Sequence, residues 1–157
     1  MPLEQELGLK KGFETGEHEV LLNIYYTASL LKKKADVFFH QFGLTDVQFN
    51  VIMLLAYQSG SQEGLSQAQL SDMMLVNRAN ITSLIDRMEK AGLVTRTAEP
   101  DDRRYNIVKM TAKGKKVFAK VESLYQRQVQ EIMTSLKPAE QKNLAAMLEK
   151  IRRKINL

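Results

Sequence analysis

The sequence predicts a mainly α-helical fold with a small β-wing, a hairpin of two short strands. Three observations support this prediction. Helix-capping patterns open several apolar segments, two β-branched segments flank an acidic-then-basic turn, and long helical segments lie towards both ends of the chain. With 157 residues, 44% of them hydrophobic and 26% charged, the chain suits a globular protein. We therefore expect a single domain over residues 1–157.

The N-terminal part is expected to be helical. Residues 1–16 hold three Gly and one Pro, a composition that indicates a loose arm or a short irregular helix. A long helix is expected over residues 17–41, and Gly43 is placed to end it. Thr45 and Gln48 then form a capping-box pattern, in which each side chain can satisfy the backbone N–H of the other, so a further helix begins there.

The central segment predicts two short helices followed by the hairpin. Ser66 and Gln69 form a second capping box. Asn77 is placed to cap the next helix, which Gly92 ends. On that helix, apolar residues at helical spacing form one face, and polar and charged residues gather on the other. The apolar face consists of Ile81, Leu84, Ile85 and Met88, and the two strands are expected at residues 93–97 and 104–110.

Two long helices are expected to complete the chain. Thr111 can cap a helix that runs to about residue 134. Pro138 suits the first position of a last helix, which ends near residue 155. The chain is therefore expected to contain about six helices and one hairpin.

The order helix, turn, helix and hairpin is that of a winged helix-turn-helix. Such a shape fits duplex DNA, with the second helix in the major groove and the wing beside the neighbouring minor groove. Residues 77–116 hold ten Lys/Arg and five Asp/Glu, so this segment alone accounts for the net charge of +5. Its excess of cations suits phosphate binding. The alternative is a solvated surface with uneven charge.

Composition and motifs disfavour several other classes of function. The chain has no Cys, which rules out disulfides, thiolate metal sites and cysteine redox sensing. We find no Ser/His/Asp constellation, phosphate loop or metal-binding motif, so an enzyme is disfavoured and no cofactor is expected. The longest apolar run, Val51–Tyr57, is far shorter than the ~20 residues of a membrane span. With no signal-peptide pattern at the N-terminus, we expect a cytoplasmic protein without membrane contact.

Over roughly residues 17–155 the chain resembles the MarR family (multiple antibiotic resistance regulators) of bacterial winged-helix transcription factors. The resemblance rests on LSQAQLSDMMLVNRANITSLIDRMEKAGLVTR and on PDDRRYNIVKMTAKG, which carries an Asp-x-Arg wing motif. It implies a DNA-binding regulator, most often a repressor, that is an obligate homodimer on a near-palindromic site. The DNA-binding lobe would span about 45–111, with dimerisation helices at about 17–42 and 112–155. The apolar character of these helices independently favours pairing with a second copy.

Side-chain chemistry and the resemblance together predict the DNA-reading residues. Arg can pair with guanine, Asn with adenine, and Ser or Thr with bases or phosphates. A pure capping role is an equal alternative for Asn77, and Arg87 could instead pair with acids on its own helix. Relatives often carry a basic residue in place of Ser83. The residues expected to read DNA from this helix are Asn77, Arg78, Asn80, Thr82, Ser83 and Arg87.

Three residues at the hairpin tip are expected to bind DNA at the minor groove or to support that contact. Arg104 resembles the family arginine that enters this groove, and Asp102 would hold it by a charge-assisted hydrogen bond. Arg103 would contact phosphate or stabilise the wing. The alternative is a solvated polar tip.

The resemblance also implies a pocket for a small-molecule effector between the first helix, the lobe and the dimerisation helices. Tyr25, His40 and Met53 are candidates to line it. Met residues suit an adaptable pocket, although they are also ordinary core residues. Two alternative functions stay open: a winged-helix protein-interaction module, and a metal-responsive regulator that uses His18 and His40.

Overall fold

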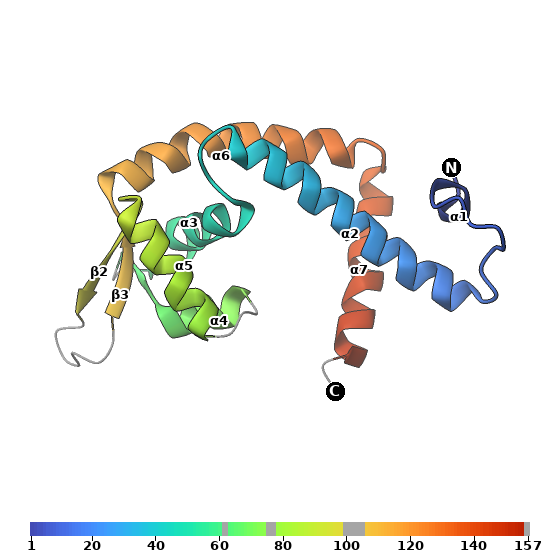
Figure 1. Ribbon diagram of the computed structural model, residues 1–157, viewed down its shortest axis with the longest axis horizontal. Helices are drawn as coiled ribbons and strands as arrows, with labels where there is room; N and C mark the ends of the chain where they lie inside the picture. Colours follow the sequence, from blue (N-terminus) through green and yellow to red (C-terminus); the bar gives the residue numbers. More distant parts are fainter. Residues whose placement is uncertain (61–62, 75–77, 99–105, 156–157) are drawn as a thin grey trace. The chain divides into compact units, whose positions relative to one another are not determined.

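The computed structural model describes residues 1–60, 63–74, 78–98 and 106–155. They fall into two compact units, Met1–Gly114 and Lys115–Leu157. The described chain is mainly helical with one small sheet (Figure 1), which confirms the predicted fold class. The elements are α1 (Leu3–Glu6), α2 (Gly16–His40), α3 (Asp46–Gln58), β1 (Leu65–Ser66), α4 (Gln67–Met74), α5 (Arg78–Lys90), β2 (Val94–Ala98), β3 (Asn106–Met110), α6 (Ala112–Met133) and α7 (Pro138–Ile155).

The predicted glycine lies in the turn that follows the long helix α2, which ends at His40. Gly43 adopts a φ of +67°, a left-handed conformation that glycine reaches without strain. The backbone N–H groups of Gly43 and Leu44 donate to the carbonyl oxygens of His40 and Phe39, at 3.0 and 3.1 Å. These two bonds form a Schellman motif, which satisfies carbonyls that the last turn of a helix leaves without partners.

Both predicted capping boxes are present. At the start of α3, the N–H of Gln48 donates to Thr45 Oγ1 at 3.2 Å, and the N–H of Thr45 donates to Gln48 Oε1 at 2.9 Å. At the start of α4, Ser66 and Gln69 exchange the same pair of bonds at 3.1 and 2.8 Å. Each box satisfies N–H groups at the helix start that have no partner within the helix, so residues close in sequence fix where both helices begin.

The sheet contains one strand that the sequence interpretation missed. β2 and β3 form the expected antiparallel hairpin, with Val94 opposite Met110. The two-residue strand β1 pairs with the other edge of β3, where Leu65 lies opposite Val108. The strand order is therefore β1-β3-β2. A strand of two residues is too short to show the alternation by which strands are recognised in a sequence.

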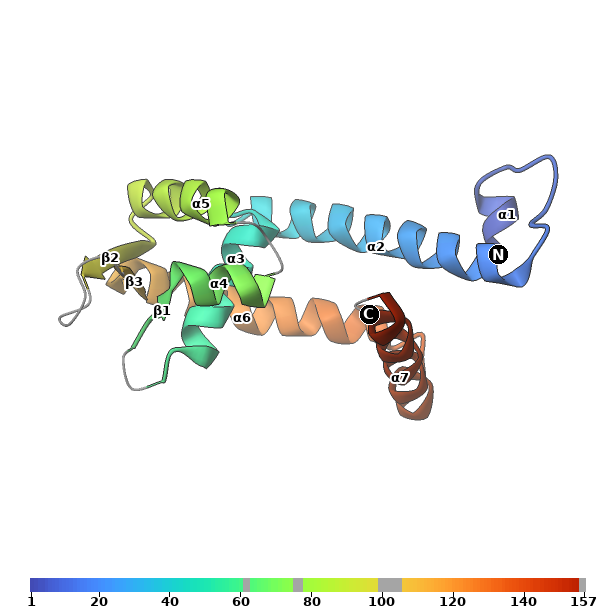
Figure 2. The ribbon, with the colours of Figure 1, turned by 90° about the horizontal axis from the view of Figure 1, so that it is seen from below.

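The core of the first unit joins α2, α3, α4 and α5 to the sheet. The ring of Phe39 on α2 stacks on Phe49 of α3, with centroids 4.7 Å apart. Ile52, Leu70 and Val108 bring α3, α4 and β3 into the same buried cluster. Figures 1 and 2 show these elements gathered at one end of α2, whose other end extends away towards α1. Burial of this apolar surface is the main force that holds the lobe together.

In the second unit, Gln141 ties the start of α7 to the end of α6. Its side-chain amide donates to the carbonyl oxygens of Met133 and Leu136, at 3.1 and 3.0 Å. Pro138 is the first residue of α7, as predicted from its fixed φ and missing N–H. None of the described helices is both long and apolar enough to cross a membrane.

Candidate nucleic-acid interface

The predicted apolar face of α5 is buried, which turns its polar side chains outwards. Ile81, Leu84, Ile85 and Met88 are each at most 5% exposed, and α5 packs against α4 and β2. Because packing on two sides fixes the rotation of the helix, the exposed surface is fixed too. The predicted DNA-reading residues on this exposed surface are Asn80, Thr82, Ser83 and Arg87.

The remaining predicted DNA contacts lie at element ends. Arg78 is the first residue of α5. In the hairpin, the last described pair is Ala98 opposite Asn106. The residues predicted to contact DNA from the wing lie between these two positions in the sequence. The predicted residues that lie outside the described part of the chain are Asn77, Asp102, Arg103 and Arg104.

Arg87 lies along the exposed surface of α5. Its Nε donates to the carbonyl oxygen of Ser83 at 3.2 Å. The neighbouring acids of the same helix, Asp86 and Glu89, pair instead with Arg96. The Arg87 guanidinium therefore lies on the polar face of α5, where a DNA phosphate could reach it.

Arg96 is a residue of this region whose role the sequence interpretation missed. It lies on β2, and its side chain is 18% exposed. Its Nη2 lies 2.5 Å from Asp86 Oδ1, and its Nη1 lies 2.7 Å from Glu89 Oε2. The sequence contains only a weak indication of this pairing. Two acids lie three positions apart on a helix, and a basic residue follows early in the next strand.

A second charged contact joins α2 to the start of α3. The ammonium group of Lys32 lies 3.0 Å from Asp46 Oδ2 and 3.7 Å from Asp36 Oδ1. The hydrogen bond to Asp46 is the main cause that raises the pKa of Lys32 above its ordinary value. These three residues line a cavity of about 430 Å³ with Asn80 and Arg87, so charges of both signs lie beside the polar face of α5.

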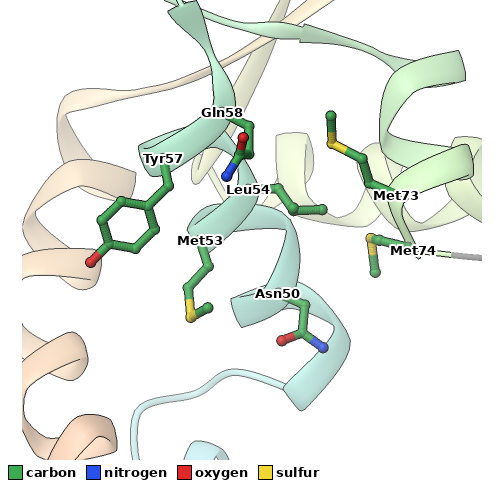
Figure 3. Close-up of a pocket in the computed structure, with 7 residues that line it drawn as sticks. All are labelled: Asn50, Met53, Leu54, Tyr57, Gln58, Met73 and Met74. Carbon is green, nitrogen blue, oxygen red and sulfur yellow. The ribbon is translucent and has the colours of Figure 1, made fainter. Parts of the chain in front are cut away.

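A less charged cavity lies between α3 and α4 (Figure 3). Its volume is about 350 Å³. Met73 and Met74 extend from α4 towards Leu54 on α3. Of the three predicted effector-binding residues, Met53 lines this cavity, whereas Tyr25 and His40 lie on α2 with exposed side chains. The full lining is Asn50, Met53, Leu54, Tyr57, Gln58, Met73 and Met74.

The two histidines are far apart. His18 lies in the first turn of α2 and His40 is its last residue, so the helix separates them by roughly 33 Å. They cannot bind one metal ion within the same chain. Among the described residues, no group of three or more His, Asp or Glu side chains could hold a metal ion.

Comparison with known proteins places these features in a family. A model of the MarR family matches residues 42–104. The HTH-type transcriptional regulator FarR of Neisseria gonorrhoeae is 32% identical over 120 residues, which cover 74% of this chain and 80% of FarR. A Thauera aromatica protein, named for transcriptional regulation of the hcr operon, is 31% identical over 111 residues. That match covers 71% of this chain and 64%, less than two thirds, of the relative.

Solved structures share the fold. The structure of MepR from S. aureus, solved as a complex with DNA, superposes with a TM-score of 0.77 at 23% identity. The superposition covers 85% of this chain and 96% of MepR.

Proposed function

The chain belongs to the MarR family of transcriptional regulators, and from this premise we propose that it is a cytoplasmic homodimer that binds a near-palindromic DNA operator and represses transcription. As a member of this family it is a regulator and not an enzyme. In this proposal the whole chain works as one domain. Its DNA-binding lobe spans about 45–111, and its dimerisation helices span about 17–42 and 112–155.

The polar face of α5 is the observation that carries the proposal. The helix buries its apolar face and exposes Asn80, Ser83 and Arg87, whose side chains can bind base edges and phosphates. MepR, which shares this fold, was solved with DNA bound. We place α5 in the major groove, with Asn77 and Arg78 at its start. Arg104, with Asp102 and Arg103, would contact the adjacent minor groove and its phosphates.

Exposed apolar residues on the terminal helices support the homodimer. On α2, Tyr25 and Val37 are 63% and 69% exposed. On α7, apolar residues three or four positions apart form an exposed stripe, the spacing of one helix face. A second copy related by a two-fold axis would bury both surfaces. The stripe on α7 consists of Leu144, Met147, Ile151 and Ile155.

The effector forms the regulatory part of the proposal. A ligand that prefers one dimer conformation lowers the affinity for DNA by the coupling free energy between the two sites. The cavity between α3 and α4 supports a role for Met53, because thioether and amide side chains form an adaptable lining. Tyr25 and His40 stay predicted contributors from α2.

The test is a binding titration of the purified protein on the DNA upstream of its own gene, with a scrambled duplex as control. We expect saturable, sequence-selective binding to two half-sites about 34–36 Å apart, with an affinity that falls steeply as salt rises. Equal affinity for the operator and the scrambled duplex would contradict operator recognition. Ligands could then be screened by the DNA release that they cause.

A further inference from the structure

We propose that Arg96 is a positioning residue that fixes the DNA-reading helix α5 to the wing strand β2 and thereby determines sequence selectivity, without itself contacting DNA. The inference rests on the proposed DNA-binding function. It concerns a basic residue in the segment that carries the excess positive charge, for which a phosphate contact is the obvious expectation.

The contacts of Arg96 run almost entirely to α5. Besides the pairs with Asp86 and Glu89, Nη2 donates to the carbonyl oxygen of Thr82 at 3.4 Å. The guanidinium therefore contacts three successive turns along α5, at Thr82, Asp86 and Glu89. With the side chain only 18% exposed and its Nη groups committed to α5, little of it is left to bind a phosphate.

Glu89 completes the connection through the backbone. Its Oε1 accepts from the N–H of Arg96 at 2.9 Å, while its Oε2 accepts from Nη1 of the same residue. Since β2 is an edge strand of the sheet, the described residues offer this N–H no strand partner on that side, and the carboxylate supplies one. One acid of α5 thus holds both the main chain and the side chain of the wing strand.

This geometry has two consequences for DNA binding. The strand that leads into the wing is fixed to the helix that reads bases, so both must approach DNA in one relative orientation. Base contacts carry the sequence information and need a defined hydrogen-bond geometry, whereas phosphate contacts carry none. In addition, Arg96 neutralises two carboxylates, 50% and 39% exposed at Asp86 and Glu89, that would otherwise repel phosphates from α5.

The experiment compares Arg96→Lys with Arg127→Lys in the full-length protein. Both substitutions keep the charge and remove the planar fork. A lysine at position 96 cannot bind Asp86, Glu89 and the Thr82 carbonyl at once. Dissociation constants are measured on the operator and on random-sequence DNA, at several salt concentrations and well below the midpoint of thermal unfolding.

For Arg96→Lys we expect operator affinity to fall roughly tenfold, as for one mismatched base pair, with random-DNA affinity and salt dependence unchanged. Arg127→Lys, the same change at an exposed position of α6 that is not among the proposed DNA contacts, should keep operator affinity. Glu89→Gln is a second variant that leaves Arg96 intact. It should lower the ratio of operator to random-DNA affinity, whereas Asp72→Asn, an equal change of charge at an exposed position on α4, should not.

Three results would overturn the inference. Unchanged operator affinity in Arg96→Lys would mean that a charge alone suffices. A lower unfolding temperature with an unchanged affinity ratio would mean that the contacts only stabilise the fold. An equal loss in Asp72→Asn and Glu89→Gln would mean that net charge, and not the link to Arg96, sets the ratio. If the wild-type protein shows no selectivity, the proposed function itself fails, which is a separate result.

Discussion

Glu89 on α5 binds Arg96 on β2 through both carboxylate oxygens, one to the backbone N–H at 2.9 Å and one to Nη1 at 2.7 Å. The two residues are seven positions apart, and the turn around Gly92 lies between them. Gly92 adopts a φ of +69°, which allows the chain to reverse directly after α5. The tight turn and the paired carboxylate together set how the wing leaves the helix.

Arg104→Ala should weaken operator binding and leave stability unchanged. The reason is the loss of a cation from the narrow minor groove, where the negative potential is strongest. Affinity is measured across a salt series, and stability by urea unfolding. An affinity equal to that of the wild type at every salt concentration would contradict the role assigned to the wing.

Arg87→Gln should reduce the salt dependence of DNA binding. For each phosphate that the variant no longer binds, the slope of log K against log salt should become less negative by about 0.9, so the slope of a dimer should change by about twice that. Random DNA should be affected as much as the operator, because phosphates carry no sequence information. A weaker affinity for the operator alone would instead assign Arg87 to a base contact.

Gly114→Ala should destabilise the protein. A Cβ at this position would lie 2.1 Å from the carbonyl oxygen of Leu93, so the start of α6 would have to move away from the backbone of Leu93. We expect the free energy of unfolding to fall by about 1–3 kcal/mol. Gly16→Ala is the matched control, since no atom lies within 4 Å of its added Cβ. Equal effects at the two positions would contradict the packing argument.

Met147→Glu should shift the dimer towards monomer. The substitution places a charge in the exposed apolar stripe of α7, where a partner copy would have to desolvate it. Ala146→Glu makes the same change of charge on the opposite face of the helix and should leave the dimer intact. Sedimentation velocity at several protein concentrations distinguishes the two. If the dimers of both variants dissociate equally, the dimer interface does not include the apolar stripe of α7.

Lys32→Met should lower stability slightly, by less than about 1 kcal/mol, because the pair with Asp46 is exposed to solvent. The pKa of Lys32 is raised above 10.5 in the folded protein, so its contribution is fully present below pH 10.5. The difference between wild type and variant should vanish as the pH rises through the raised folded-state pKa. Urea unfolding at several pH values measures this, with Lys33→Met as control. A difference that grows above pH 10.5 would contradict the pairing.

Helix ends and the buried face of α5 were predictable because their causes lie close together in the sequence. The box at Thr45 and Gln48 and the turn at Gly43 depend on bonds between residues at most five positions apart. The apolar face of α5 depends only on helical spacing. The DNA-reading surface follows from it, because a helix that buries its apolar face leaves its polar residues facing outwards.

The order and type of the main elements, and the side of α5 that faces away from the core, therefore follow from the amino-acid sequence alone. The folded structure was needed to establish the pairing of β1 with β3, the contact of Lys32 with Asp46, and the contacts of Arg96 with α5. Each of these contacts joins residues on different elements. At the surface a charged side chain has many possible partners of opposite charge. Which pair forms depends on distances between charged groups, and these are set only after the apolar core has brought the elements together.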